Sequence, residues 1–127
     1  MTDPVAEIYR HIGSEQPFVR LVDAFYSGVE ADQLLRPMYS EDLTDARKHL
    51  AQFLIQRTGG PTTYSDDRGH PRMRGRHLPF HIGLLERNAW MHHMENALEA
   101  TPEFGPHRAV MHAFFDDFSM FMINQPS

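Results

Sequence analysis

The chain has 127 residues, of which 41% are apolar and 23% charged, and its formal net charge is −5. This length predicts a single domain over residues 1–127 with its own hydrophobic core. The acidic balance disfavours nucleic acid as a partner, and the absence of cysteine excludes disulfides and thiolate metal sites. Because no signal-peptide pattern or membrane-length apolar stretch is present, we expect no membrane association and a cytoplasmic location.

Apolar residues at helical spacing predict an all-α fold. A short helix is expected over 5–11, ended by Gly13, and a second helix opens at residues 14–17. The second helix carries the clearest buried face in the chain, at the i, i+3, i+4, i+7 spacing of one side of a helix. That face consists of Phe18, Leu21, Val22, Phe25, Tyr26 and Val29.

The next segments are predicted to form a turn and a third helix. A helical turn over 34–39 is closed by Pro37, since the residue before a proline is pushed out of the helical region. Ser40 or Asp42 can then cap a helix that runs from 43 to about 57. Its apolar side consists of Leu43, Ala46, Leu50, Phe53 and Leu54.

The second half of the chain is predicted as a loop followed by two helices. Gly59-Gly60-Pro61 ends the third helix, and residues 62–72 lack periodicity, which indicates a long loop. A fourth helix is expected over 80–98 and a fifth over 107–122, the latter with an apolar stripe wide enough for burial on two sides. The inner side of the fourth helix is predicted to hold Ile82, Leu85, Ala89, Trp90, Met94, Ala97 and Leu98.

His77 is the residue on which a functional interpretation depends. A neutral imidazole is the commonest protein ligand for a metal, and one on a short, braced element suits the proximal side of a haem iron. Gly75 and Pro79 bracket this element and keep it short. Taken alone, a histidine beside apolar residues is more often an ordinary packed or surface group than a ligand.

The flanks of His77 suit a haem ligand. Leu78 and Phe80 could line an apolar wall, and Pro79 stiffens the backbone after the ligand. Arg74 and Arg76 could meet two acidic propionates at the rim.

Two interpretations without haem stay open. His77 and His81 stand four residues apart, as His112 and Asp116 do, so a non-haem helical protein with His and Asp metal ligands is one alternative. Pro79 counts against a regular helical pair of histidines. The other alternative is an interaction module without a cofactor, which would leave the internal tyrosines and the tryptophan without a purpose.

An ordered set of motifs resembles the group II truncated haemoglobins. The set is Phe25-Tyr26, Tyr39, Gly59-Gly60-Pro61, Tyr64, Arg68-Gly69-His70-Pro71, Arg76-His77-x-Pro79-Phe80 and Glu86-Arg87-x-Ala89-Trp90. The resemblance runs from about Phe18 to Leu98. It implies a truncated globin fold, a two-on-two helical sandwich around haem b, with dioxygen and related diatomic gases such as NO and CO as ligands.

The resemblance also implies roles for single residues. It makes His77 the proximal iron ligand and places Tyr26, Tyr39 and Trp90 around the distal ligand. Two phenols and an indole are three hydrogen-bond donors, and donors stabilise the partial negative charge of dioxygen in such a site. Ala46 stands where vertebrate globins have a distal histidine. The expected distal wall is completed by Leu50 and Phe25.

The remaining contacts to the cofactor are expected from residues that the same resemblance places beside the haem: Arg76, His70, Tyr64, Phe53, Leu54, Met73 and Phe80. The sequence departs from the family pattern at two places. Thr58 stands where close relatives often have an aromatic residue. One residue fewer precedes Glu41, which leaves the direction of Tyr39 open.

Three donors acting together are expected to slow the release of dioxygen, because leaving breaks several hydrogen bonds at once. Slow release argues against bulk oxygen transport and favours redox or detoxification chemistry, either NO dioxygenation or peroxide reduction. The first reaction needs a reductase partner, and the second lacks a distal histidine to shuttle protons. The physiological reaction and assembly into an oligomer stay open.

Overall fold

The computed structural model describes residues 3–126, and these residues form helices and loops without any strand. The predicted all-α class is therefore confirmed. No helix in this part of the chain is both long and apolar enough to cross a membrane. The helices are η1 (Val5–Glu7), α1 (Ile8–Ile12), α2 (Gln16–Glu30), η2 (Arg36–Met38), α3 (Thr44–Arg57), α4 (Thr63–Arg68), α5 (Met73–His77), α6 (Leu84–Glu99), η3 (Pro102–His107) and α7 (Arg108–Phe121).

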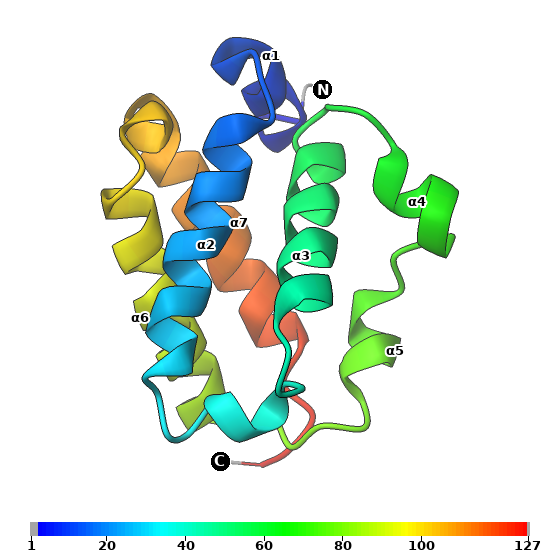
Figure 1. The fold of residues 1–127 in the computed structure, drawn as a ribbon, viewed down its shortest axis with the longest axis vertical. Helices are drawn as coiled ribbons and strands as arrows, with labels where there is room; N and C mark the ends of the chain where they lie inside the picture. Colours follow the sequence, from blue (N-terminus) through cyan, green and yellow to red (C-terminus); the bar gives the residue numbers. More distant parts are fainter. Residues whose placement is uncertain (1–2, 127) are drawn as a thin grey trace.

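Helix α2 is the element around which the longer helices pack. It lies against α3 and also against α6, and α6 in turn packs against α7. Figure 1 shows α2 and α3 side by side with α7 crossing behind them. This arrangement is the predicted sandwich of two helices on two others.

The predicted buried face of α2 is confirmed in full, because each of its six members is buried. The Phe18 ring meets the Phe104 ring edge to face, with centroids 5.2 Å apart, and Phe25 meets Trp90 in the same way at 5.3 Å. Burying a large apolar side chain contributes roughly 1.5–3 kcal/mol. Helix α2 is therefore the rigid centre of the molecule.

Both ends of α3 are fixed by side chains. The Asp42 carboxylate accepts a hydrogen bond from the Thr44 amide at 2.9 Å, so Asp42 is the cap at the start. At the other end the fully buried Thr58 donates its hydroxyl proton to the Leu54 carbonyl at 2.7 Å. Thr58 thus satisfies its own polar group inside the core. Gly59 then takes a positive φ of 102° and ends the helix, as predicted.

Two predicted boundaries are wrong. The segment 62–72 is not a continuous loop, because α4 forms within it and buries Tyr64 against Phe53, with ring centroids 5.8 Å apart. The fourth long helix begins at Leu84 rather than at residue 80, since the Gly83 amide donates to the Glu86 carboxylate at 2.7 Å and starts the helix there. Leu85, expected on the inner side, is 73% exposed.

Three smaller predictions, on Pro37, Gly75 and the apolar stripe of α7, are also wrong. Pro37 lies inside η2 and does not close the turn, because its fixed φ suits the first positions of a helix. Gly75 lies within α5 and does not precede it. The stripe of α7 is buried on one side only, and Phe121 is 62% exposed.

We predict that Gly59→Ala lowers the free energy of unfolding by about 2–3 kcal/mol. An alanine there would be strained by the positive φ, and its Cβ would stand 2.1 Å from the Ala6 carbonyl oxygen. Urea unfolding followed by circular dichroism measures the effect. Gly105→Ala is the control, because its Cβ meets no atom within 4 Å. Equal stabilities for the two variants would contradict this account of the turn.

Candidate functional site

A cavity lies between α3, α5 and the pair formed by α6 and α7. It consists of two hollows of about 460 and 650 Å³, volumes that include space open to solvent. His77, Tyr39, Trp90 and Phe118 border both hollows, which makes them two parts of one cavity. A concave site lined mainly by aromatic and aliphatic side chains, with a few polar groups among them, is typical of ligand and cofactor sites.

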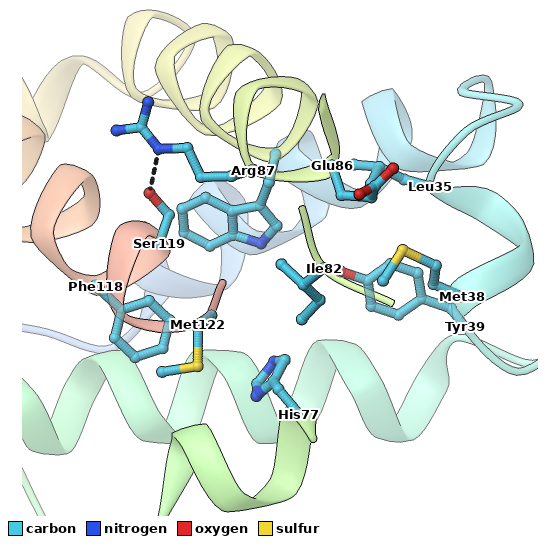
Figure 2. Close-up of a pocket in the computed structure, with 11 residues that line it drawn as sticks. Leu35, Met38, Tyr39, His77, Ile82, Glu86, Arg87, Phe118, Ser119 and Met122 are labelled. Atoms are coloured by element: carbon cyan, nitrogen blue, oxygen red, sulfur yellow. Dashed lines mark hydrogen bonds between the residues drawn. The ribbon is translucent and has the colours of Figure 1, made fainter. Parts of the chain in front are cut away.

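His77 is the last residue of α5, and its half-buried side chain points from that helix into the cavity (Figure 2). Its Nδ1 lies 2.6 Å from the Met73 carbonyl oxygen. A carbonyl only accepts, so Nδ1 carries the proton, and in the neutral ring Nε2 then holds a free lone pair. Among residues 3–126 no hydrogen-bond partner occupies Nε2. The bond at Nδ1 thus fixes the orientation of the imidazole, and the lone pair of Nε2 is available to bind a metal ion.

Tyr26, Tyr39 and Trp90 also border the cavity. The rings of Tyr26 and Tyr39 meet edge to face with centroids 5.5 Å apart. One residue fewer before Glu41 has therefore not turned Tyr39 away from the site.

The polar atoms of Tyr26, Tyr39 and Trp90 distinguish this part of the cavity. Within the described part of the chain, neither phenol hydroxyl nor the indole N–H has an acceptor among the hydrogen bonds. These groups belong to residues that border the cavity, so each is free to donate to a molecule bound there. A ligand that accepts hydrogen bonds would supply the acceptor here.

Burial keeps both phenols protonated. Removal from water raises the pKa of Tyr39 to about 12. The same cause, with the neighbouring Tyr39 adding to it and Arg47 opposing it, raises the pKa of Tyr26 further above its ordinary value. Each hydroxyl is therefore a hydrogen-bond donor at physiological pH.

Several of the other expected residues also border the cavity. Ala46 and Leu50 lie along one wall, and Tyr64 and Met73 lie nearby, with the Tyr64 hydroxyl 4.0 Å from the Met73 sulfur. Arg76 borders the same hollow, but its guanidinium already donates to backbone carbonyls of the segment before α5. These contacts use Nε and Nη2 and keep Arg76 close to the cavity.

The structure does not bring all the expected residues to the cavity wall. Phe25, Phe53 and Leu54 are buried in the core and border neither hollow, although Phe53 supports the lining residue Phe118 with ring centroids 5.5 Å apart. His70 and Phe80 are exposed and border neither hollow.

His49 lines the cavity but was not predicted from the sequence to do so. It follows Ala46 by three residues and precedes Leu50 and Phe53 on α3, so the helical spacing carried the signal. Burial first, and then the Arg68 guanidinium 3.1 Å from its Nε2, lower the pKa of His49. A further set of lining residues was also missed: Leu35, Met38, Ile82, Glu86, Arg87, Phe118, Ser119 and Met122.

The alternative without haem is not favoured by the structure. The described residues contain no cluster of three or more His, Asp or Glu side chains able to hold a metal ion. His112 lies 2.5 Å from the Glu95 carboxylate, and Asp116 forms an ion pair with Arg87. His81 is exposed beyond the end of α5, so it does not share a helical face with His77.

The cavity fits a haem. Its walls are mainly aromatic and aliphatic, which suits a flat apolar macrocycle, and Figure 2 shows His77 aimed between Ile82, Met122 and Phe118. An imidazole with a free lone pair and three unpaired donors on other elements border the same space. These are the groups that a haem iron and its diatomic ligand require.

Comparisons with known proteins agree with this site. A family model described as bacterial-like globin matches residues 7–124. A group 2 truncated haemoglobin of Bacillus subtilis is 37% identical over 117 residues, which cover 92% of this chain and 88% of that protein.

Solved structures give the same answer. The haemoglobin of the thermophilic phototrophic bacterium Chloroflexus aurantiacus superposes with a TM-score of 0.90 at 47% identity, covering 94% of this chain and 98% of that chain. The truncated oxygen-avid haemoglobin of Bacillus subtilis superposes with a TM-score of 0.87 at 35% identity, covering 93% and 99%. Globins bind haem b and diatomic gases, so haem b is the cofactor of this protein and dioxygen is among its ligands. The chain belongs to the group II truncated haemoglobins, within the bacterial-like globin family.

Proposed function

We propose that His77 binds the haem iron through Nε2. The hydrogen bond between its Nδ1 and the Met73 carbonyl supports this role, because it fixes the tautomer and the rotation of the ring. Bound haem would supply an iron that takes up a diatomic ligand. The other wall residues would shape the apolar space and keep water from it.

We further propose that Tyr26, Tyr39 and Trp90 hold that ligand. The observation that carries the proposal is the set of three donors without a protein acceptor at the wall of one cavity. Each net hydrogen bond contributes on the order of 1 kcal/mol, so together they would slow release by orders of magnitude. Strong retention opposes bulk oxygen transport. The relative from Bacillus subtilis is oxygen-avid, which agrees with retention.

The role that suits retention best is oxidation of nitric oxide by the retained dioxygen. In that reaction both atoms of dioxygen would be transferred to the NO nitrogen to give nitrate, and one electron would be consumed in each turnover. A separate reductase must supply that electron. The tyrosine and tryptophan donors would stabilise the negative charge that develops on the oxygen atoms during transfer.

Peroxide reduction is the weaker candidate. It needs a group that moves protons at the ligand, and Ala46 stands where a distal histidine would do this. Besides His77, the only imidazole in the lining of the two hollows is that of His49, which accepts a hydrogen bond from Arg68 through Nε2. That nitrogen is therefore not free to take a proton from a ligand.

We predict that Tyr26→Phe and Trp90→Phe each accelerate dioxygen release by about fivefold or more, since each removes one donor worth roughly 1 kcal/mol. Stopped-flow displacement of dioxygen by carbon monoxide measures the rate. Tyr9→Phe is the matched control, because Tyr9 packs on Phe18 in the core and does not border the cavity. Unchanged release in both distal variants would show that these donors do not hold the ligand.

We predict that protein loaded with dioxygen converts nitric oxide into an equimolar amount of nitrate within the mixing time. Ion chromatography of the products after rapid mixing measures the yield. Protein saturated with carbon monoxide is the control, because its ligand site is blocked. A product mixture without nitrate would contradict the proposed oxidation and leave simple ligand binding.

We predict that the free energy of unfolding falls as the pH rises from about 10 to about 12. The unfolded chain releases its tyrosine protons near pH 10, whereas the folded state retains that of Tyr39 up to about pH 12, so high pH favours unfolding. Urea unfolding at a series of alkaline pH values measures the fall. Tyr39→Phe should make it shallower, because that variant has no phenol to titrate at this position. Identical slopes in Tyr39→Phe and in the wild-type protein would contradict the burial of the Tyr39 hydroxyl.

A further inference from the structure

Helix α5, which carries His77, has little core packing to hold it in place, because Met73 is its one residue that packs against the core and is itself only half-buried. None of its residues is buried, and it packs along the length of no other helix in the described part of the chain. Figure 1 shows it at the edge of the fold, apart from the α2, α3, α6 and α7 bundle. The position of His77 must therefore be set by specific contacts at the ends of α5.

The main contact comes from a residue far along the chain, Asn124. Its amide nitrogen donates to the His77 carbonyl at 3.2 Å and to the Phe80 carbonyl at 2.8 Å. Its amide oxygen accepts from the Ile82 N–H at 3.0 Å, and its own backbone N–H donates to the Ile82 carbonyl at 2.9 Å. One asparagine thus binds both ends of the segment that leads from His77 to α6.

Neighbours of Asn124 strengthen the attachment. The Gln125 N–H donates to the same Ile82 carbonyl at 3.1 Å. On the other side, Arg74 of α5 donates through Nε to the Phe121 carbonyl at 3.2 Å, and its guanidinium lies over the Phe121 ring at 5.8 Å. Residues 121–125, which we name the C-terminal strap, therefore hold α5 from both ends.

We propose that the C-terminal strap sets the position of the proximal histidine, with Asn124 as its positioning residue. The proposal rests on the proposed role of His77 as the iron ligand. The Met73 carbonyl fixes only the rotation of the imidazole, whereas the Asn124 amide holds the backbone of His77 itself. The strap thus determines how far the ring projects into the cavity and at what tilt.

The chemistry of the amide explains why asparagine suits this position. Two backbone carbonyls need donors and one backbone N–H needs an acceptor, and an asparagine side chain offers both kinds of group. An aspartate at this position would keep the acceptor but place a negative charge against two carbonyl oxygens. The matched pair of alanine and aspartate variants therefore tests the donors specifically.

The experiment compares Asn124→Ala and Asn124→Asp with Asn96→Ala, an exposed asparagine of α6 that lies beside His92 and outside the cavity. Resonance Raman spectra of the ferrous, ligand-free protein report the iron–histidine stretching band. Transfer of haem to an excess of another apoglobin reports its rate of loss. We expect both Asn124 variants to shift the band and to lose haem roughly tenfold faster, since each loses the two hydrogen bonds that the amide nitrogen donates. Values equal to those of Asn96→Ala would overturn the proposal.

His77→Gly separates failure of this inference from failure of the proposed function. If His77→Gly keeps the wild-type stretching band, another residue binds the iron and the proposed ligand is wrong. If the band disappears in that variant and returns with added imidazole, while the Asn124 variants behave as wild type, only the role of the strap is wrong.

Hydrogen exchange in the wild-type protein decides the case in which the Asn124 variants fail to fold. Slow exchange at the amides of Ile82, Asn124 and Gln125 supports the strap, because each of these donors has a partner there. Exchange at the rate of an unstructured chain would overturn it.

Discussion

The main constraint on this fold is that three hydrogen-bond donors remain without protein acceptors at the wall of one apolar cavity. They are the hydroxyls of Tyr26 and Tyr39 and the indole N–H of Trp90. A donor without a protein partner adds no hydrogen-bond energy to folding, so such a site must be stabilised by the rest of the fold. Helix α2 provides this stability, because Phe18, Leu21 and Phe25 bury large apolar surfaces on the face that also carries Tyr26. The core therefore holds the donors ready before any ligand arrives.

The two sides of the cavity are supported in different ways. Tyr26 and Trp90 stand on the long helices α2 and α6, which pack against each other through Phe25. His77 stands on a helix of five residues that buries none of them and is held by hydrogen bonds. Donors that a rigid scaffold already holds in place cost little reorganisation energy when charge develops beside them. The side of the cavity that carries His77 has no such scaffold, and hydrogen bonds connect it to the rest of the fold.

How much the sequence predicts depends on the range of the interactions involved. The buried face of α2 and the cap of α3 follow from local spacing and local hydrogen bonds, and both were predicted. The start of α6 was predicted wrongly: the local bond between the Gly83 N–H and the Glu86 carboxylate begins the helix, and Asn124 from the far end of the chain binds Ile82 just before it. The segment around Tyr64 was predicted to be a loop because no local pattern marks its short helix. Contact with Phe53 on another helix, α3, stabilises it instead. Short motifs drew attention to His77, which does border the cavity, whereas nothing local indicated the hydrogen bond from Asn124 to its carbonyl.

The corner that carries Tyr39 is held by side chains that bind its backbone. The resemblance to the truncated haemoglobins had left the direction of Tyr39 open, because it implied one residue fewer before Glu41. The Arg36 guanidinium donates to the Ser40 carbonyl at 3.0 Å and to the Glu41 carbonyl at 2.7 Å, and so closes the turn. Asp32 accepts from the Leu34 N–H at 2.8 Å on the other side. Because these side chains satisfy carbonyl and amide groups of the corner, the turn holds its shape, and the ring of Tyr39 lies against that of Tyr26 at the cavity wall.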